Sequence, residues 1–316
     1  MCPQAVDAAP PFRYREGMNM IAPDQGQAAV EISHAANTSG RPVTIMASRS
    51  WRGRLALAGA DLAETLRLWP LVWTLSLLDI RLRYRGSLLG PFWLTLSTAV
   101  MIGAIGFLYS RLFHQNISAY LPFLSISLVL WNFISTVTSD GCICFTQSEG
   151  MIRAMRMPLS LHAARAVLRN ILVLAHNIVV IAVVFAVFHT VPSLASFSLL
   201  PAAALWVVDA MALTLLLGAF GTRFRDIPPI VASVVQIAFY ITPIMWNPAM
   251  LTHRGLSDVL VTWNPFYALL EIMRAPLLGG PLNHAAWTAA LGYSAALVLL
   301  AGAVFARARA RIAYWV

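Results

Sequence analysis

The chain has 316 residues, of which 59% are hydrophobic and only 11% are charged, and its mean hydropathy is +0.71. A soluble domain carries about 25% charged residues, so this composition excludes an ordinary water-soluble protein and predicts a polytopic membrane protein. The formal net charge is +9, but the arginines stand at the ends of apolar runs, which argues against nucleic-acid binding.

The first part of the chain is polar and rich in Ala, Pro, Gly and Ser, and it lacks the apolar core of a signal peptide. We therefore predict a disordered cytoplasmic extension over residues 1–60 and a membrane domain over residues 61–316.

An apolar, aromatic stripe recurs at three- and four-residue steps between Leu66 and Tyr84, so its members share one helical face. Arg67, Arg81 and Arg85 lie beside the stripe, as expected for a helix in the headgroup layer of a membrane. Pro70 fits a first turn or a kink, so either one bent helix or two pieces are expected. A buried helix of a small soluble domain is the alternative, which the adjacent apolar run disfavours.

Six apolar runs follow, each close to the ~20 residues that a helix needs to cross a bilayer. They cover residues 91–112, 120–139, 163–188, 199–222, 227–246 and 285–306. Because lipid offers no hydrogen-bond partner to an open backbone, these runs predict an all-α fold with about six spans.

Arginine is concentrated in alternate connections: before the first run, after the second, after the fourth and after the sixth. Arginine-rich connections stay in the cytoplasm. We therefore predict a multi-pass membrane protein with both termini in the cytoplasm.

The loop of residues 140–158, DGCICFTQSEGMIRAMRMP, combines methionine and arginine around a predicted short helix, which Pro158 is expected to end. Surfaces rich in Met and Arg suit docking to another protein. The alternative is a plain loop held to anionic lipid by its arginines. The candidate docking residues are Ser148, Glu149, Met151, Arg153, Arg156 and Pro158.

Asp209 lies deep inside the fourth run, where a charge costs about 2.5–3.5 kcal/mol on insertion scales. The third and fourth runs cross in opposite directions, which puts His176 and Asn177 at a similar depth. The sequence thus predicts a hydrogen-bonded cluster of these three residues. A structural link is favoured over a proton relay or a substrate contact.

The segment of residues 264–280, NPFYALLEIMRAPLLGG, is apolar but too short to cross a bilayer. Asn264 and Pro265 open it, and Glu271 can pair with Arg274 at i, i+3. Short re-entrant helices in the outer leaflet are predicted, with a surface helix of the outer loop as the alternative.

Motifs for catalysis are absent or weak. The sequence has no Walker A loop, no G-x-S-x-G and no H-E-x-x-H. His253 and Asp258 form the H-x4-D pattern of some acyltransferases, but two fixed positions occur often by chance. Cys142 and Cys144 form C-x-C with no further ligands nearby, so no metal site is predicted. We predict that the chain is not an enzyme and carries no cofactor of its own.

The stretch RLRYRGSLLGPFW, residues 81–93, resembles the opening segment of permease subunits of ABC transporters that export polysaccharides, such as capsule, O-antigen and polyol phosphate polymers. The resemblance covers roughly residues 62–316. It continues at YLPFLSISLVLWNF (120–133), at residues 150–158, at RFRDI (223–227), at YITPIMW (240–246), at residues 264–274 and at RIAYW (311–315).

The resemblance implies a homodimer of permeases joined by two ATP-binding cassette subunits, which bind ATP and Mg. It implies that a lipid-linked glycan moves outward along the dimer interface. On this analogy residues 66–85 form an interface helix, residues 140–158 hold a coupling helix, and residues 264–280 narrow the exit. The interface helix and opening residues are then Arg81, Arg83, Tyr84, Arg85, Gly90 and Pro91.

A sugar polymer needs a polar path with aromatic rings on which its faces stack. Trp93, Trp131 and Tyr240 are the candidate channel-lining residues, and headgroup anchoring is the alternative for each. The chain departs from the family in its N-terminal extension and in having Arg where relatives show a Lys-rich run.

Three rival functions remain open at this point. One is an ABC exporter permease for a drug or a small lipid. A second is a proton-coupled secondary transporter using Asp209, which the lack of an internal repeat disfavours. A third is a membrane acyltransferase using His253.

Overall fold

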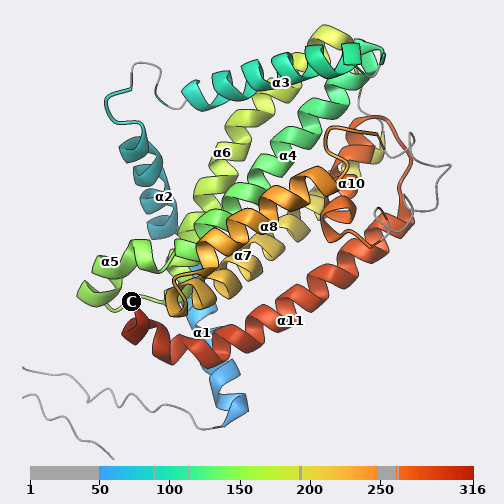
Figure 1. The fold of residues 1–316 in the computed structure, drawn as a ribbon. Helices are drawn as coiled ribbons and strands as arrows, with labels where there is room; N and C mark the ends of the chain where they lie inside the picture. Colours follow the sequence, from blue (N-terminus) through green and yellow to red (C-terminus); the bar gives the residue numbers. More distant parts are fainter. Residues whose placement is uncertain are drawn as a thin grey trace, which may run out of the picture. The chain divides into compact units, whose positions relative to one another are not determined.

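The computed structural model describes residues 50–87, 90, 92–112, 114–191, 194–247, 261 and 263–316. Within these ranges every regular element is a helix (Figure 1). This confirms the prediction of an all-α polytopic membrane protein. The predicted extension lies outside the described residues as far as residue 49.

Two helices occupy the segment predicted as an interface helix. α1 spans Trp51–Arg67 and α2 spans Trp69–Arg83. Pro70 lies in the first turn of α2, where its missing N–H costs no hydrogen bond. The two-piece alternative is therefore correct, and helical structure begins at Trp51, before the predicted boundary at residue 61.

Five helices among the described residues are long and apolar enough to cross a membrane. They are α3 (Phe92–Leu112), α4 (Ile117–Ile143), α6 (Leu159–Phe188), α7 (Leu199–Arg223) and α11 (His284–Trp315). A short 3-10 turn, η2 (Leu194–Ser198), precedes α7. Each of the five contains most of one predicted run.

The run at residues 227–246 is the exception, because its helix α8 spans only Ile227–Ile241. Thr242 has an extended backbone, which the following Pro243 favours, since proline disfavours the α conformation of the residue before it. The described residues therefore contain a sixth apolar helix that is shorter than the predicted span.

The segment at residues 264–280 contains one short helix, α10 (Pro265–Leu277). It packs against α4, α7 and α11, and Leu270 and Ile272 are fully buried. A helix lying free on the surface does not fit this burial. Residues 248–260 lie outside the described ranges, so a paired re-entrant helix there stays a prediction.

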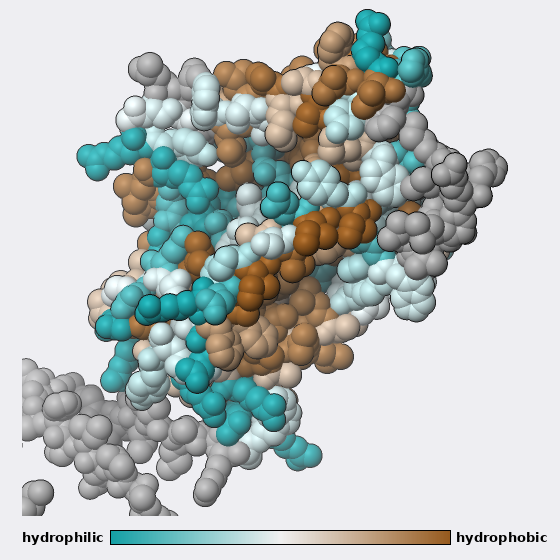
Figure 2. Space-filling model, in the orientation of Figure 1, coloured by the Kyte–Doolittle hydropathy of each residue, from teal (hydrophilic) through white to brown (hydrophobic). Residues whose placement is uncertain are grey.

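α4 forms the centre of the fold, with α3, α6, α7, α8 and α10 packed around it (Figure 1). α4 and α7 approach closely where glycines lie: a Cβ on Gly221 would meet the Cys142 carbonyl oxygen at 2.0 Å. Small residues of this kind let two helices in lipid pack backbone against backbone. Figure 2 shows hydrophobic side chains across the middle of the visible face and hydrophilic ones toward the end that carries α1.

Candidate functional site

The loop predicted to dock a partner contains two short helices after α4. η1 spans Thr146–Ser148, and α5 spans Glu149–Ala154. The short helix is thus present, but Pro158 does not end it. α5 stops at Met155, whose backbone is extended, and Pro158 is instead the residue before the first turn of α6. Proline suits that place because the first N–H groups of a helix have no partner inside it.

α5 is bound to the rest of the molecule by a few contacts. Arg153 pairs with Glu149 over 2.8 Å and also donates to the carbonyl oxygen of Val316. Met151 accepts a contact at 3.9 Å from the guanidinium of Arg165, on α6. Arg156 is exposed and makes no hydrogen bond or ion pair with any other described residue.

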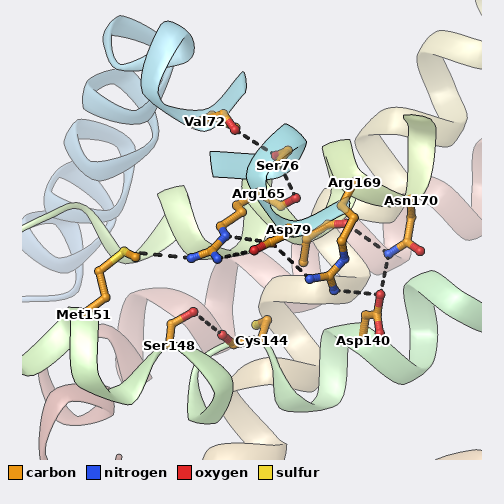
Figure 3. Close-up of polar contacts among 11 residues, drawn as sticks. Val72, Ser76, Asp79, Asp140, Cys144, Ser148, Met151, Arg165, Arg169 and Asn170 are labelled. Atoms are coloured by element: carbon orange, nitrogen blue, oxygen red, sulfur yellow. Dashed lines mark hydrogen bonds and ion pairs between the residues drawn. The ribbon is translucent and has the colours of Figure 1, made fainter. Parts of the chain in front are cut away.

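Behind α5 lies a partly buried network of two acids and two arginines (Figure 3). Asp79 of α2 binds both Arg165 and Arg169 of α6. Arg169 also donates to Asp140 of α4 over 2.8 Å, and Asn170 donates to the same carboxylate over 2.9 Å. The network therefore joins the predicted interface helix to both helices that flank the coupling loop.

A further acid, Asp61 of α1, lies at the start of α6 and is fully buried, with only 1% exposed. Its carboxylate accepts hydrogen bonds from the backbone N–H groups of Leu159 at 3.2 Å and Ser160 at 2.9 Å. Asp61 supplies the helix cap that Pro158 cannot provide, and a negative charge is favourable at this end of a helix. Arg309 of α11 completes the site with a 2.7 Å ion pair to Asp61.

Sequence reasoning did not assign roles to Asp61, Asp79 or Asp140. One signal could have drawn attention to Asp79. The chain has only 13 acidic residues, and Asp79 stands between the apolar residues Leu78 and Ile80. A carboxylate in such surroundings needs a cationic partner. The identity of that partner could not be read from the sequence.

The described residues at this end of the molecule hold charges in place through ion pairs. They contain no group of three or more His, Cys, Asp or Glu that could bind a metal. Burial raises the pKa of the Cys144 thiol, so Cys144 is not a ready nucleophile. A polar cavity of about 300 Å³ beside Asp79 and Arg165 suits bound water.

The residues predicted for the interface helix and opening segment lie at the end of α2 and beyond it. Arg81, Arg83 and Arg85 are exposed, and Tyr84 follows the last turn of α2. Gly90 has a positive φ of 54°, a conformation that favours glycine. Pro91 lies outside the described residues.

The structure places two of the three predicted channel residues at one groove. This groove, of about 280 Å³ between α4 and α8, is lined by Trp131 and Tyr240 together with Gln236 and other residues. Trp131 is buried and packs on Phe239 with ring centroids 5.9 Å apart, whereas Tyr240 is 67% exposed. Trp93 lies exposed on α3 and does not line this groove.

The predicted cluster of His176, Asn177 and Asp209 is wrong. Asp209 accepts a 2.6 Å hydrogen bond from Ser294 of α11, and His176 is exposed and bonded to the carbonyl oxygen of Leu172 in its own helix. The side-chain oxygen of Asn177 has no partner among the described residues. A similar depth along two antiparallel helices does not fix the direction in which a side chain points.

The outer segment contains the predicted ion pair. Arg274 pairs with Glu271 over 2.6 Å, although its side chain is nearly fully buried. The same guanidinium donates to Ser127 of α4 and to the carbonyl oxygen of Pro243, just after α8. It also lies over the ring of Phe123, 4.4 Å from the centroid. Arg274 thus joins α10 to α4 and to the end of α8.

Asn264 fixes the start of α10. Its side-chain oxygen accepts from the N–H groups of Phe266 and Tyr267, and its amide donates to Thr242 over 3.0 Å. Pro265 occupies the first position of the helix, where it is favourable.

Comparison with known proteins gives a family and several relatives. Residues 70–278 match the family described as ABC-2 type transporter. The chain is 22% identical over 197 residues to the O-antigen export system permease protein RfbA of Myxococcus xanthus, covering 62% of this chain and 76% of that protein. It is 23% identical over 207 residues to the protein of the same name from Klebsiella pneumoniae, covering 65% of this chain and 79% of that one.

Proposed function

The chain belongs to the ABC-2 type transporter family, and from this premise we propose that it is the permease subunit of an exporter of a lipid-linked polysaccharide. Membership makes it a membrane transport subunit and not itself an enzyme. The similarity to O-antigen export permeases over about two thirds of the chain carries the proposal of the substrate. ATP and Mg are then bound by a separate ATP-binding cassette subunit, present in two copies beside two copies of this chain.

The exposed surface formed by α5 and the two residues after it supports docking of the ATP-binding subunit. Met155 and Arg156, which directly follow α5, are exposed, and Arg156 has no partner among the described residues. An arginine beside a methionine suits a protein partner, because the sulfur adapts to the surface and the guanidinium binds a carboxylate. Glu149 and Arg153 complete the face as an i, i+4 pair.

The contacts of α5 suggest how movement of the partner reaches the membrane helices. α5 lies between α4 and α6 in the chain, and Arg165 contacts both Met151 and Asp79. A displacement of α5 therefore acts on α6 directly and on α2 through the same guanidinium. Arg169 extends the connection to Asp140 on α4. In this mechanism the partly buried ion pairs of Asp79 and Asp140 keep α2, α4 and α6 together while α5 follows the ATP-binding subunit.

The groove between α4 and α8 supports a path for the glycan. Trp131 and Tyr240 offer rings for sugar faces, and Ser135, Ser139 and Gln236 offer hydrogen bonds beside them. α8 itself buries only Val235, so most of its surface is free to face a second copy. Two such grooves facing each other would enclose a channel with aromatic and polar walls.

Several helices carry arginines at ends that lie near α1. This supports placing these ends on the same side of the membrane. Arg223 lies over the ring of Trp315, Arg309 pairs with Asp61, and Arg153 contacts Val316. We place this end in the cytoplasm of a cell with an inner membrane, where the ATP-binding subunit finds ATP.

The proposal is tested in cells that make the glycan. Removal of this chain is expected to leave lipid-linked polysaccharide inside the cell, and a lectin applied from outside measures its loss from the surface. Arg156→Glu is expected to lower surface glycan and the amount of ATP-binding subunit that copurifies with the permease. Arg111→Glu, exposed at the end of α3, is the matched control and should change neither.

Two results would contradict the proposal. If Arg156→Glu and Met155→Glu both left copurification and export unchanged, the surface formed by α5 and the two residues after it would not be the docking site. If export survived ATP depletion but stopped when the proton gradient collapsed, the chain would act as a secondary carrier, and the ABC exporter assignment would fail.

A further inference from the structure

A partly open apolar cavity of about 290 Å³ lies between α4, α7, α10 and α11, apart from both the coupling loop and the α4–α8 groove. Four aromatic residues line it: Phe133, Trp206, Phe266 and Tyr293. Aliphatic side chains supply most of the remaining wall. A cavity of this size and lining accommodates a small organic molecule.

The polar groups of the aromatic walls are already bonded elsewhere. The indole N–H of Trp206 donates to the carbonyl oxygen of Leu269 over 3.1 Å, and the hydroxyl of Tyr293 donates to the carbonyl oxygen of Trp263 over 3.1 Å. These bonds fix the orientation of both rings. They leave the rings available to a ligand mainly through their π-systems.

One group in the lining remains unsatisfied, the carboxyl group of Asp209. Its Oδ2 accepts the hydrogen bond of Ser294, whereas its Oδ1 is buried without a partner among the described residues. The residue is 7% exposed, and none of the ion pairs among the described residues includes it. The lining contains no arginine.

We propose that this cavity binds a lipophilic ammonium ion, whose charge is neutralised by Asp209 and whose apolar part packs against the aromatic walls. Aromatic rings attract a cation through their negative faces, and quaternary ammonium groups are recognised by such rings. A carboxylate without a cationic partner at this depth is unfavourable, and an incoming ammonium supplies the missing charge. A neutral apolar molecule would fill the cavity but leave the carboxyl group unpaired.

The depth of Asp209 decides the source of the ammonium group. Asp209 lies near the middle of α7, which spans Leu199–Arg223, so it lies far from both ends of that helix. A lipid headgroup is confined to the membrane surface and does not reach this depth. The ligand is therefore a free amphiphilic amine or quaternary ammonium ion. This inference does not rest on the proposed export of a glycan.

The test compares two probes of the same shape, benzyltrimethylammonium and its neutral isostere neopentylbenzene. Binding of each to the purified full-length chain in detergent is measured by calorimetry, without ATP or glycan. The cation is expected to bind with one site per chain and more tightly than the neutral probe. Asp209→Asn, which keeps the volume and the bond to Ser294, should weaken cation binding about tenfold or more and leave the neutral probe unaffected.

Two further variants keep the test decisive. Asp226→Asn removes an exposed acid at the start of α8 and should leave cation binding unchanged. Leu213→Trp enlarges a partly buried side chain of the lining and should block both probes, even if Asp209→Asn does not fold. Equal binding of the two probes to the natural chain would overturn the proposal. It would also fail if Asp209→Asn bound the cation normally, if Asp226→Asn lost as much affinity, or if Leu213→Trp bound both probes.

Discussion

Arg309 of α11 donates a hydrogen bond to Asp61 of α1 over 2.7 Å, although the two residues are 248 positions apart in the chain. Asp61 at the same time accepts from the first N–H groups of α6. One carboxylate therefore joins three helices at the end that carries the proposed coupling loop.

Asp61→Asn is expected to lower the free energy of unfolding by about 1–3 kcal/mol, because an amide nitrogen cannot accept from a helix N–H and leaves it unsatisfied. Thermal unfolding of the purified chain in detergent measures the loss. Glu64→Gln, an exposed acid on the same helix, is the control and should leave the unfolding temperature unchanged. Equal stability of the two variants would show that the cap contributes nothing.

Asp79→Asn is expected to loosen α2 from α6, since two arginines lose their shared carboxylate. Hydrogen–deuterium exchange of the backbone amides of α2 should become faster, while exchange in α7 stays as it was. Arg81→Gln serves as the control, because Arg81 is exposed on the same helix. Unchanged exchange in α2 would mean that apolar packing of Val72 and its neighbours holds the helix alone.

Gly221→Ala is expected to destabilise the fold by about 1–3 kcal/mol, because the added methyl group meets the Cys142 carbonyl oxygen and forces α4 and α7 apart. Gly292→Ala is the matched control on α11, where nothing lies within 4 Å of the added atom. That change should be neutral or stabilise by up to about 1 kcal/mol through helix propensity. Both effects are measured by thermal unfolding, and a neutral Gly221→Ala would refute the close packing.

Arg274→Gln is expected to lower the free energy of unfolding by about 3–5 kcal/mol, because it leaves the partners of a buried guanidinium unpaired. Arg274→Lys keeps the charge but not the fork geometry, so its loss should be smaller. Unfolding temperatures of the two variants, compared with exposed Arg111→Gln, test this order. A lysine variant as unstable as the glutamine variant would show that charge is irrelevant at this position.

The thiol of Cys144 is expected to react very slowly with maleimide between about pH 7 and about pH 9, the range in which an ordinary thiol ionises. Burial raises the pKa of its thiol, so a smaller fraction is thiolate at each pH than for an exposed cysteine. Thr146→Cys in the background of Cys144→Ser gives the comparison, because Thr146 is exposed two residues away. Its labelling rate should rise with pH, whereas Cys144 should react only after denaturation. Rapid labelling of Cys144 in the folded chain would contradict its burial.

The long apolar helices were predictable because each needs about twenty apolar residues, and this pattern is local. α4, α6, α7 and α11 accordingly contain the predicted runs. α8 was predicted too long because the apolar composition continues through Thr242 and Pro243, while the helix stops before the proline. The early start of α1 was missed although its signal is local, because the side chain of Ser50 caps the helix by accepting from the N–H of Gly53.

The candidate site was predictable only in part, for a similar reason. The position of the short helix followed from local composition, and the pair of Glu271 with Arg274 followed from their spacing. Asp79 and Arg165 are 86 positions apart, so no local pattern pairs them. Asp209 was singled out correctly as an unusual acid, but its partner Ser294 belongs to a helix 85 positions away.

The bond between Asp61 and Arg309 also has a consequence for synthesis of the chain. Asp61 is made before α6 and can cap that helix once Ser160 has been made, but Arg309 lies near the end of α11 and is made 248 residues after Asp61. A nascent chain thus carries this carboxylate without its arginine partner until most of α11 has been made. Chains interrupted before Arg309 therefore lack the ion pair that joins α11 to α1.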